Sequence, residues 1–428
     1  MASLETARPA SARPALPRKY LLWLVGTRAS LLGDAVLYFA LGWAASAHGG
    51  GTAALVLTAI TLPRTLLLLL GGAVCDRYGA RPVMIAGDAV MLTLTLTLVL
   101  ALVRPGPAAS PWLLVTVAVV IGTVDACYLP ATGAMPRQLV GKEQLPRALA
   151  MQQAGGQIAS LLGAPMGSVL VAAAGLTGAA VADAGTFAIV LLVLIRLRPD
   201  FDVERSPRGE GLVAGTVGGV RIAAGHPVLR PALLLTAAAA CFLLPVVSLL
   251  SPLLAREHGW SSEVTGLIAG GQSLGMLAVA LVVSRRGTMS RIGRGAALGL
   301  CVSVPGITAM ALAGTTAVVV AGGIVVGAGS GLFACHIGPL VLPCIPDTHL
   351  ARMQALLVLV QSLALVVGNN VLGALADARG ATVAVAVCAA GAFVAGIAGL
   401  LSKPMRRLHR KSSGVVPLVA DSTVSRRS

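Results

Sequence analysis

The sequence predicts an all-α membrane protein with twelve transmembrane helices arranged as two six-helix bundles. Of the 428 residues, 56% are hydrophobic and 11% are charged, whereas soluble domains carry about 25% charged residues. Twelve stretches are mostly apolar over the roughly 20 residues that a membrane-spanning helix needs. The basic residues are also shared unequally among the connections between these stretches.

Each apolar stretch is expected to be a helix, because lipid cannot satisfy the hydrogen bonds of an extended backbone. Long apolar runs such as 94–103 lack the polar–apolar alternation of a membrane β-barrel. The expected spans are 20–46, 52–74, 83–103, 111–134, 148–174, 178–197, 231–255, 262–284, 294–314, 316–342, 352–376 and 380–402.

A long polar interruption divides these spans into two groups of six. Residues before the fifth and eleventh spans are similar, as expected of two repeats in one chain. We therefore expect a cytoplasmic tail over 1–19, a first bundle over 20–197, a cytoplasmic linker over 198–230, a second bundle over 231–402 and a basic cytoplasmic tail over 403–428.

The positive charge indicates the orientation of the chain. The formal net charge is +16, with 32 Lys and Arg residues. With a cytoplasmic N-terminus, only Arg104, Arg256 and Arg379 fall in outer loops, and only Arg28 and Arg64 fall within spans. Cytoplasmic loops carry such an excess of basic residues, so both termini are expected in the cytoplasm. Dispersed over short loops, this charge faces lipid headgroups and does not indicate nucleic-acid binding.

The sequence lacks the residue patterns of an enzyme or a metal site. Seven cysteines contain no C-x-x-C pair, and Cys335, His336 and Cys344 are too few and too far apart to predict a metal site. A Ser/His/Asp set or an H-E-x-x-H motif is not found, which disfavours a membrane-embedded enzyme. We expect no cofactor and no resident metal.

The most specific motif is GGAVCDRYGARP, which runs from residue 71 to 82 between the second and third spans. It resembles the signature loop of the major facilitator superfamily, whose conserved places are taken by Gly72, Asp76, Arg77, Gly79 and Arg81. We expect Gly72 to let two helices approach and Gly79 to form the tight turn. The resemblance implies that this cytoplasmic loop latches the two bundles, with Asp76 accepting hydrogen bonds from a helix N-terminus.

Two further features resemble the branch of that superfamily that exports drugs and siderophores. The stretch from Asp125 to Phe187 resembles this branch. In the fifth span, Gly163, Pro165 and Gly167 resemble a glycine–proline motif associated with antiporters, although Ser168 stands in place of a further glycine. The resemblance implies efflux driven by proton exchange and a part in multidrug resistance.

Charged side chains within spans are costly, by at least about 2.5–3.5 kcal/mol each at mid-membrane. Six are expected there: Arg28, Asp34, Arg64, Asp88, Asp125 and Asp183. In the family the first and fourth helices line a central cavity, so Asp34 and Asp125 are the candidates for carrying a coupling proton. The alternative is a structural role, in ion pairs with Arg28 or Arg64 or in hydrogen bonds between helices.

Spacing along the helices suggests partners for these groups. Tyr38 follows Asp34 by four residues and Tyr128 follows Asp125 by three, which puts each acid and phenol on one helix face. Arg64 is expected to pair with Asp34 or, alternatively, to recognise an anionic substrate. Asp88 is expected beside the Arg77 and Arg81 loop. Asp183 is expected near the outer end of the sixth span, in a structural role.

The remaining cavity candidates are few, because aromatic residues make up only 3% of the chain. Tyr38, Tyr128, Phe242, Phe333 and His336 are expected to face the cavity, with an otherwise aliphatic wall in the second bundle. Such a wall favours an amphipathic or hydrophobic compound over a sugar.

A function follows from these observations together with the family resemblance. We expect a secondary active transporter in a bacterial inner membrane, acting by alternating access as a monomer. It would export a small amphipathic or hydrophobic compound, such as a drug, antibiotic or siderophore-like molecule. An ion gradient would supply the energy, since no G-x-x-x-x-G-K-[ST] phosphate loop occurs. The alternative is an importer or facilitator of a small metabolite with the same fold.

Overall fold

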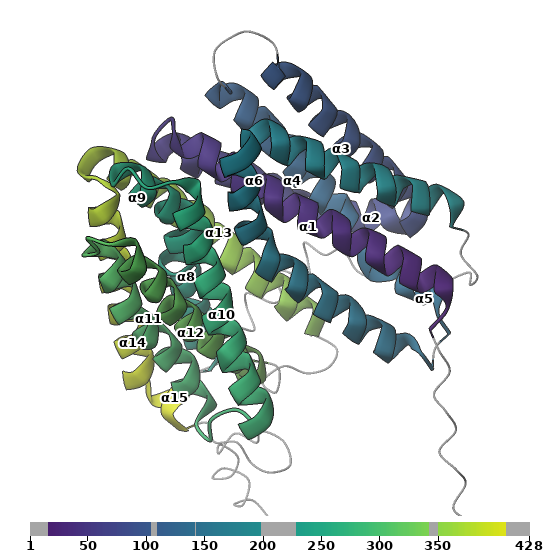
Figure 1. Ribbon diagram of the computed structural model, residues 1–428. Helices are drawn as coiled ribbons and strands as arrows, with labels where there is room; N and C mark the ends of the chain where they lie inside the picture. The colour runs from purple at the N-terminus through teal and green to yellow at the C-terminus, as the bar shows by residue number, and fades with distance from the viewer. Residues whose placement is uncertain (1–15, 104–108, 142, 198–227, 342–349, 408–428) are drawn as a thin grey trace, which may run out of the picture.

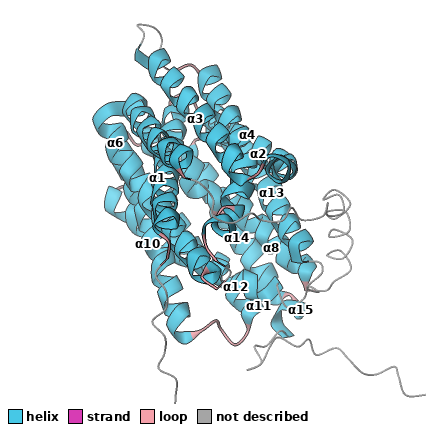
Figure 2. Ribbon diagram, turned by 90° about the vertical axis from the view of Figure 1, so that its right-hand side faces the viewer, coloured by secondary structure: helices cyan, strands magenta, loops and turns pink. Residues whose placement is uncertain are grey.

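The computed structural model describes residues 16–103, 109–141, 143–197, 228–341 and 350–407, and these residues form a chain of helices without strands (Figures 1 and 2). Eleven helical stretches of this described part are long and apolar enough to cross a membrane. The predicted all-helical membrane fold is therefore confirmed.

Six spans form the first half of the molecule, which we call the N-half. Its helices are α1 (Arg18–Ser46), α2 (Gly50–Tyr78), α3 (Ala80–Val103), α4 (Pro111–Ala134), the short α5 (Pro136–Leu139) and α6 (Leu145–Arg196). The central packing is between α1 and α6 and between α2 and α4.

The second half, the C-half, contains α8 (Leu229–Phe242), the π-helical turn η1 (Val246–Leu250), α9 (Ser251–Glu257), α10 (Ser262–Arg286), α11 (Ile292–Ala311), α12 (Thr316–Val341), α13 (Leu350–Arg379), α14 (Ala381–Leu401) and α15 (Lys403–Arg407).

Helix α6 accounts for the difference between eleven stretches and twelve predicted spans. It contains 52 residues, and its backbone leaves helical geometry at Gly175, where φ is +63°. A straight helix of that length would measure about 78 Å, more than twice the roughly 30 Å hydrocarbon core of a bilayer. The two arms on either side of Gly175, visible as a sharp bend in Figure 1, correspond to the fifth and sixth predicted spans.

The outer surface of the helices suits a lipid environment. Large apolar side chains such as Leu66, Leu100, Val169 and Val394 are each more than half exposed, and many others resemble them. A soluble monomer rarely exposes so much contiguous apolar surface. The buried core is also apolar, so the helices are hydrophobic on all sides, as expected of membrane spans.

The two halves meet at the end of the molecule that holds the C-terminus of α1, the N-terminus of α2 and helix α9. We call this end the closed face. There α2 packs on α13 and the first arm of α6 packs on α10. The Asp377 carboxylate accepts hydrogen bonds from the backbone N–H groups of Gly50 and Gly51, at 2.5 and 2.7 Å. Arg256 donates to the Trp43 carbonyl across 2.9 Å and stacks 4.3 Å from that indole ring.

The halves spread apart toward the opposite end, which holds the beginning of α1 and helix α15 (Figure 1). We call this end the terminal face. Most of the predicted linker (198–230) and most of both predicted tails lie outside the described residues.

Candidate functional site

Two joined cavities lie among the described helices. One, which we call the C-half cavity, has a volume of about 540 Å³ and is lined by C-half residues alone. The other, the interface cavity, has a volume of about 500 Å³ and lies between the two halves. Leu244, Gln272 and Ser273 line both. Pockets of roughly 300–1,000 Å³ are typical of sites for drug-sized ligands.

The walls of the two cavities are mostly apolar with a few polar groups. In the C-half cavity the polar side chains are Thr236, Gln272, Ser273, Ser330 and Gln361, and Phe333 is the aromatic one. The interface cavity adds polar side chains from both halves: Tyr38, Thr61, Arg64, Ser160, Ser248, Thr265 and Asn369.

A π turn in the seventh span lies beside both cavities. The span predicted over 231–255 is found as one apolar stretch, Leu229–Glu257, in which α8 ends at Phe242 and the wide π turn η1 follows Pro245. Leu244 lines both cavities next to this turn, and Ser248 lines the interface cavity. Single π turns inside helices occur frequently at functional sites.

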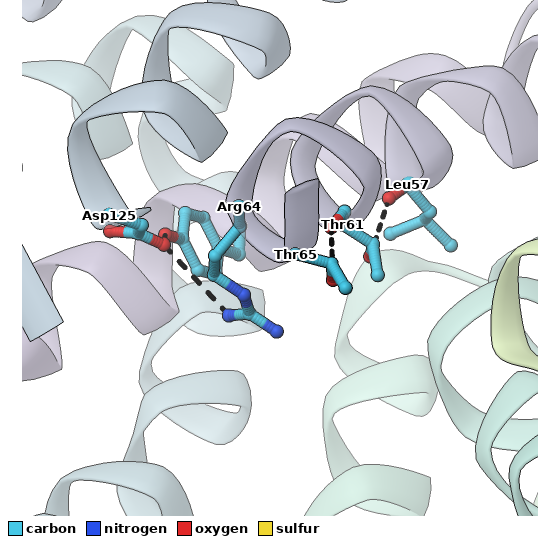
Figure 3. Close-up of polar contacts among 6 residues, drawn as sticks. Leu57, Thr61, Arg64, Thr65 and Asp125 are labelled. Atoms are coloured by element: carbon cyan, nitrogen blue, oxygen red, sulfur yellow. Dashed lines mark hydrogen bonds and ion pairs between the residues drawn. The ribbon is translucent and has the colours of Figure 1, made fainter. Parts of the chain in front are cut away.

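A charged cluster stands in the N-half wall of the interface cavity (Figure 3). The Asp125 Oδ2 atom, on α4, accepts a hydrogen bond of 2.8 Å from the Tyr38 hydroxyl on α1. The same oxygen lies 3.9 Å from Arg64 Nη1 on α2. Tyr38 and Arg64 line the cavity directly, and Asp125 lies behind them with a side chain that is 21% exposed. The cluster therefore connects three helices to the surface that a ligand would touch.

These contacts differ from the expected pairing in two ways. Arg64 pairs with Asp125 and not with Asp34, because α2 packs closely on α4. Tyr38 likewise reaches across to Asp125 and does not bond the acid one turn before it on α1. Asp34 lines neither cavity and has no hydrogen-bond or ion-pair partner in the described part of the chain.

Two further acids are fully buried in the N-half. Asp183 packs against Gly33 of α1 and is fully buried, eight residues after the Gly175 bend at which the sixth span begins. Asp88 lies beside Tyr128 and far from solvent. The Tyr128 hydroxyl lies next to the Asp88 carboxylate, and Tyr128 lines neither cavity, contrary to expectation. The expected grouping of Asp88 with the basic loop is therefore wrong.

Arg28, the other cation within the spans of the N-half, does not pair with an acid in the described structure. Its Nη1 atom donates to the Gln152 carbonyl across 3.3 Å, and its side chain packs over Gly155 and Gly156 on α6. The proposed ion pair between Arg28 and Asp34 or Asp125 is not observed.

The C-half candidates separate into one cavity residue and two packing residues. Phe333 lines the C-half cavity as expected. Phe242 turns away and packs against Gly391 on α14. His336 is fully buried against Gly295, and both ring nitrogens have partners: Nε2 accepts from the Met289 backbone N–H across 3.0 Å, and Nδ1 lies 2.8 Å from the Leu332 carbonyl. His336 thus fixes the connection between α10 and α11 and does not face either cavity.

The loop between α2 and α3 lies at the terminal face and is not engaged with the C-half. Gly79 makes the turn with a φ of +90°, and Arg81 donates to the carbonyls of Leu194 and Ile195 within the N-half. Asp76 and Arg77 are exposed.

The close helix approach expected at Gly72 occurs instead at its neighbour. A side chain at Gly71 would collide with the backbone of α4 at Ala126, whereas Gly72 has open space around it. The rotation of α2 about its axis decides which of the two adjacent glycines faces α4. This rotation cannot be read from the spacing of the motif.

The glycine–proline motif of the fifth span lies where α6 meets α1 and α10. Gly163 and Gly167 pack directly on Ala35 and Phe39 of α1. Pro165 contacts α10 at Gly270, and Ser168 packs on Gly266 of the same helix. The motif is thus part of the contact between the halves, next to the cavity residue Ala164.

One functional group was not anticipated from the sequence. Asp377 on α13 caps the N-terminus of α2 and joins the halves at the closed face. Only the three-dimensional pairing of α2 with α13 reveals this contact, because 326 residues separate Asp377 from Gly51. No group of three or more metal-ligating side chains occurs among the described residues.

Comparisons with known proteins agree with this architecture. The family model described as Major Facilitator Superfamily matches residues 24–285 and 233–424. The chain is 26% identical over 273 residues to the multidrug efflux pump Tap of Mycolicibacterium fortuitum, an alignment that covers 60% of this chain and 66% of that protein, slightly under two thirds of its length. It is 23% identical over 365 residues to the uncharacterized MFS-type transporter YfiS of Bacillus subtilis (strain 168), covering 83% of this chain and 85% of that one.

Solved structures share the fold at low sequence identity. A point mutant of the nucleoside transporter NupG superposes with a TM-score of 0.74 at 12% identity, over 90% of this chain and 100% of that one. A bacterial homologue of the iron transporter ferroportin in an inward-facing state superposes with a TM-score of 0.63 at 16% identity, over 90% and 99% of the two chains. The match along both halves shows that this chain is a multi-pass membrane transporter that belongs to the Major Facilitator Superfamily.

Proposed function

We propose that this transporter exports a small, largely apolar compound in exchange for protons. The observation that carries the proposal is the cluster of Tyr38, Arg64 and Asp125 in the wall of an otherwise mostly apolar cavity between the halves. A membrane-embedded acid of this kind is functional by default, because burying it without a role is costly. Distant similarity to a protein named as a multidrug efflux pump supports the export direction.

Alternating access would proceed by rocking of the two halves about the cavities. The closed face is held by the Asp377 and Arg256 contacts, and the halves are separated at the terminal face (Figure 1). If the termini are cytoplasmic, as the distribution of basic residues predicts, this conformation accepts a compound from the cytoplasm. Release to the outside would require the Asp377 contact to open and the loop around Asp76 to engage.

Asp125 is the residue that we assign to the coupling proton. When ionised, its charge is balanced by Arg64 and by the hydrogen bond from Tyr38. Protonation would remove that charge and leave the Arg64 guanidinium without its anion at the cavity wall. Because Arg64 and Tyr38 also line the cavity, a bound compound and a proton would affect the same three side chains. Asp34 is the second candidate, but it does not reach either cavity.

Uptake into everted membrane vesicles tests both the direction and the energy source. A compound is first identified by accumulation assays with a panel in a deletion strain. An exporter coupled to protons should concentrate that compound inside everted vesicles whose interior is acidic, and nigericin, which collapses the pH gradient, should abolish the accumulation. Accumulation only in right-side-out vesicles would instead indicate an importer.

A further inference from the structure

The two halves contribute different kinds of polar group to the joined cavities. All polar side chains that the described C-half places in either wall are uncharged. Arg64, from the N-half, is the one charged residue among the described lining of both cavities, and its side chain is 39% exposed. No carboxylate lines either wall within the described residues, since Asp125 stands behind Arg64 and Tyr38.

Several of the uncharged C-half groups have no hydrogen-bond partner in the described structure. Thr265 and Asn369 line the interface cavity and are each 1% exposed, yet Thr265 Oγ1 and Asn369 Oδ1 accept or donate no bond. Ser330 Oγ, in the C-half cavity, is also buried and unpaired. These atoms lie just beneath the cavity walls, and buried polar groups are normally satisfied. A ligand would therefore gain affinity by bonding them once their side chains turn into the cavity.

Two side-chain amides add to this set. Gln272 lies at the junction of the two cavities, and Gln361 lines the C-half cavity. A carboxamide offers both a donor and an acceptor, and together with the unpaired hydroxyls these amides can bond the carbonyl, ether or hydroxyl groups of a neutral molecule. They cannot balance a charge.

We propose that the joined cavities bind an uncharged, mostly apolar compound through these C-half groups and reject organic cations. A cation entering the interface cavity would meet Arg64 before any acid, and like charges repel strongly where water is scarce. Asp125 behind Arg64 weakens this repulsion without reversing it, because the pair presents its positive end to the cavity. An anion gains little there, because it must lose its hydration to pair with a guanidinium whose charge Asp125 already shares. This inference rests on the proposed function only in treating the cavities as the substrate site.

Two probes of matched shape test the proposal directly. Triphenylphosphine oxide and methyltriphenylphosphonium share three phenyl rings and differ in a neutral P=O group against a cationic P–CH₃ group. Equilibrium binding to the purified full-length chain in detergent, measured by isothermal titration calorimetry, should show the oxide binding at least tenfold more tightly. Triphenylacetate, the anionic counterpart, should also bind more weakly than the oxide.

Variants separate the charge effect from the neutral recognition. Arg64→Gln should improve phosphonium binding at least tenfold and so remove most of the preference for the oxide. Thr265→Val and Asn369→Leu should each weaken oxide binding by about fivefold or more. Thr65→Val is the control, because the Thr65 hydroxyl already donates to the Thr61 carbonyl and lines neither cavity.

The proposal is overturned if the phosphonium or triphenylacetate binds as tightly as the oxide, or if the oxide does not bind up to its solubility limit. It is also overturned if the oxide affinity is the same in the Thr265, Asn369 and control variants. Because binding is measured without an ion gradient, these results do not depend on whether transport is driven by protons or on its direction.

Discussion

The hydroxyl of Tyr38, on α1, donates a hydrogen bond of 2.8 Å to the carboxylate of Asp125, on α4. Arg64, on α2, approaches the same oxygen at 3.9 Å, so one carboxylate connects three helices of the N-half (Figure 3). Two of the three side chains also line the interface cavity. A change in the charge of Asp125 is therefore transmitted directly to the surface that contacts a ligand.

Removing the Tyr38 hydroxyl should weaken coupling. Tyr38→Phe deletes a hydrogen bond to a charged acceptor, an interaction worth about 1.5–3 kcal/mol, and should reduce gradient-driven uptake into everted vesicles roughly tenfold or more. Tyr128→Phe is the matched comparison, because Tyr128 lies beside Asp88 and lines neither cavity. Equal loss of uptake in the two variants would argue against a special role for the contact between Tyr38 and Asp125.

The Asp377 contact should hold the closed face shut. Asp377→Asn replaces a carboxylate that accepts two backbone N–H bonds at a helix N-terminus, where a negative charge is favoured. Losing about 1.4 kcal/mol would change the ratio of the two conformations tenfold. Spin-label distances across the closed face should lengthen in a larger fraction of molecules.

Glu263→Gln serves as the control for this experiment. Glu263 is an exposed acid near the same face, in the first turn of α10, with no hydrogen-bond or ion-pair partner in the described structure. Its replacement should leave the distance distribution unchanged. A closed face that stays shut in Asp377→Asn would show that the other contacts between the halves suffice.

Adjacent glycines of the signature loop should respond differently to the same change. Gly71→Ala would force a methyl group into the α4 backbone at Ala126, whereas Gly72→Ala meets open space. We expect Gly71→Ala to lower the thermal unfolding temperature of the purified protein and Gly72→Ala to raise it slightly, since alanine favours a helix over glycine by about 0.5–1 kcal/mol. Similar destabilisation in both would contradict the packing of α2 on α4.

His336 should matter for stability and not for ligand binding. His336→Ala removes a fully buried ring that bonds the Met289 backbone and packs on Gly295, a loss that we expect to cost about 1–3 kcal/mol. Thermal unfolding should occur at a lower temperature. The affinity of the folded protein for triphenylphosphine oxide should stay within twofold of the wild type. His48→Ala, at an exposed site, should have little effect on unfolding. Weakened binding in a stably folded His336 variant would place this residue at the cavity after all.

The fold could be predicted from the sequence because its signals are long and local. A membrane span is recognised from a run of roughly 20 apolar residues, and the basic loops independently indicate the orientation. The π turn at Val246–Leu250 could not be predicted, since a Pro inside an apolar run does not by itself distinguish a kink from a π turn. The turn at Gly175 was anticipated only as a gap between two spans.

The sequence predicted which residues line the cavities better than it predicted which side chains bond one another. Tyr38, Arg64 and Phe333 do line the cavities, but the partner of each polar group depends on which helices are neighbours. The i, i+4 spacing of Asp34 and Tyr38 suggested a pair within one helix, whereas the packing of α1, α2 and α4 offers Asp125 instead. His336 and Phe242 turn toward neighbouring helices, because Gly295 and Gly391 have no side chains and their rings occupy the space left there.

The most direct test of the central claim is substrate-induced proton release from the purified protein in weakly buffered detergent solution, followed with a pH-sensitive dye. At a pH low enough to protonate Asp125 in the free protein, the wild type should release protons when its substrate is added, and Asp125→Asn should release none while still binding the substrate. Asp183→Asn, at a buried acid outside both cavities, should release protons as the wild type does. Undiminished release from Asp125→Asn, or its loss only in Asp34→Asn, would contradict the assignment of the coupling proton to Asp125.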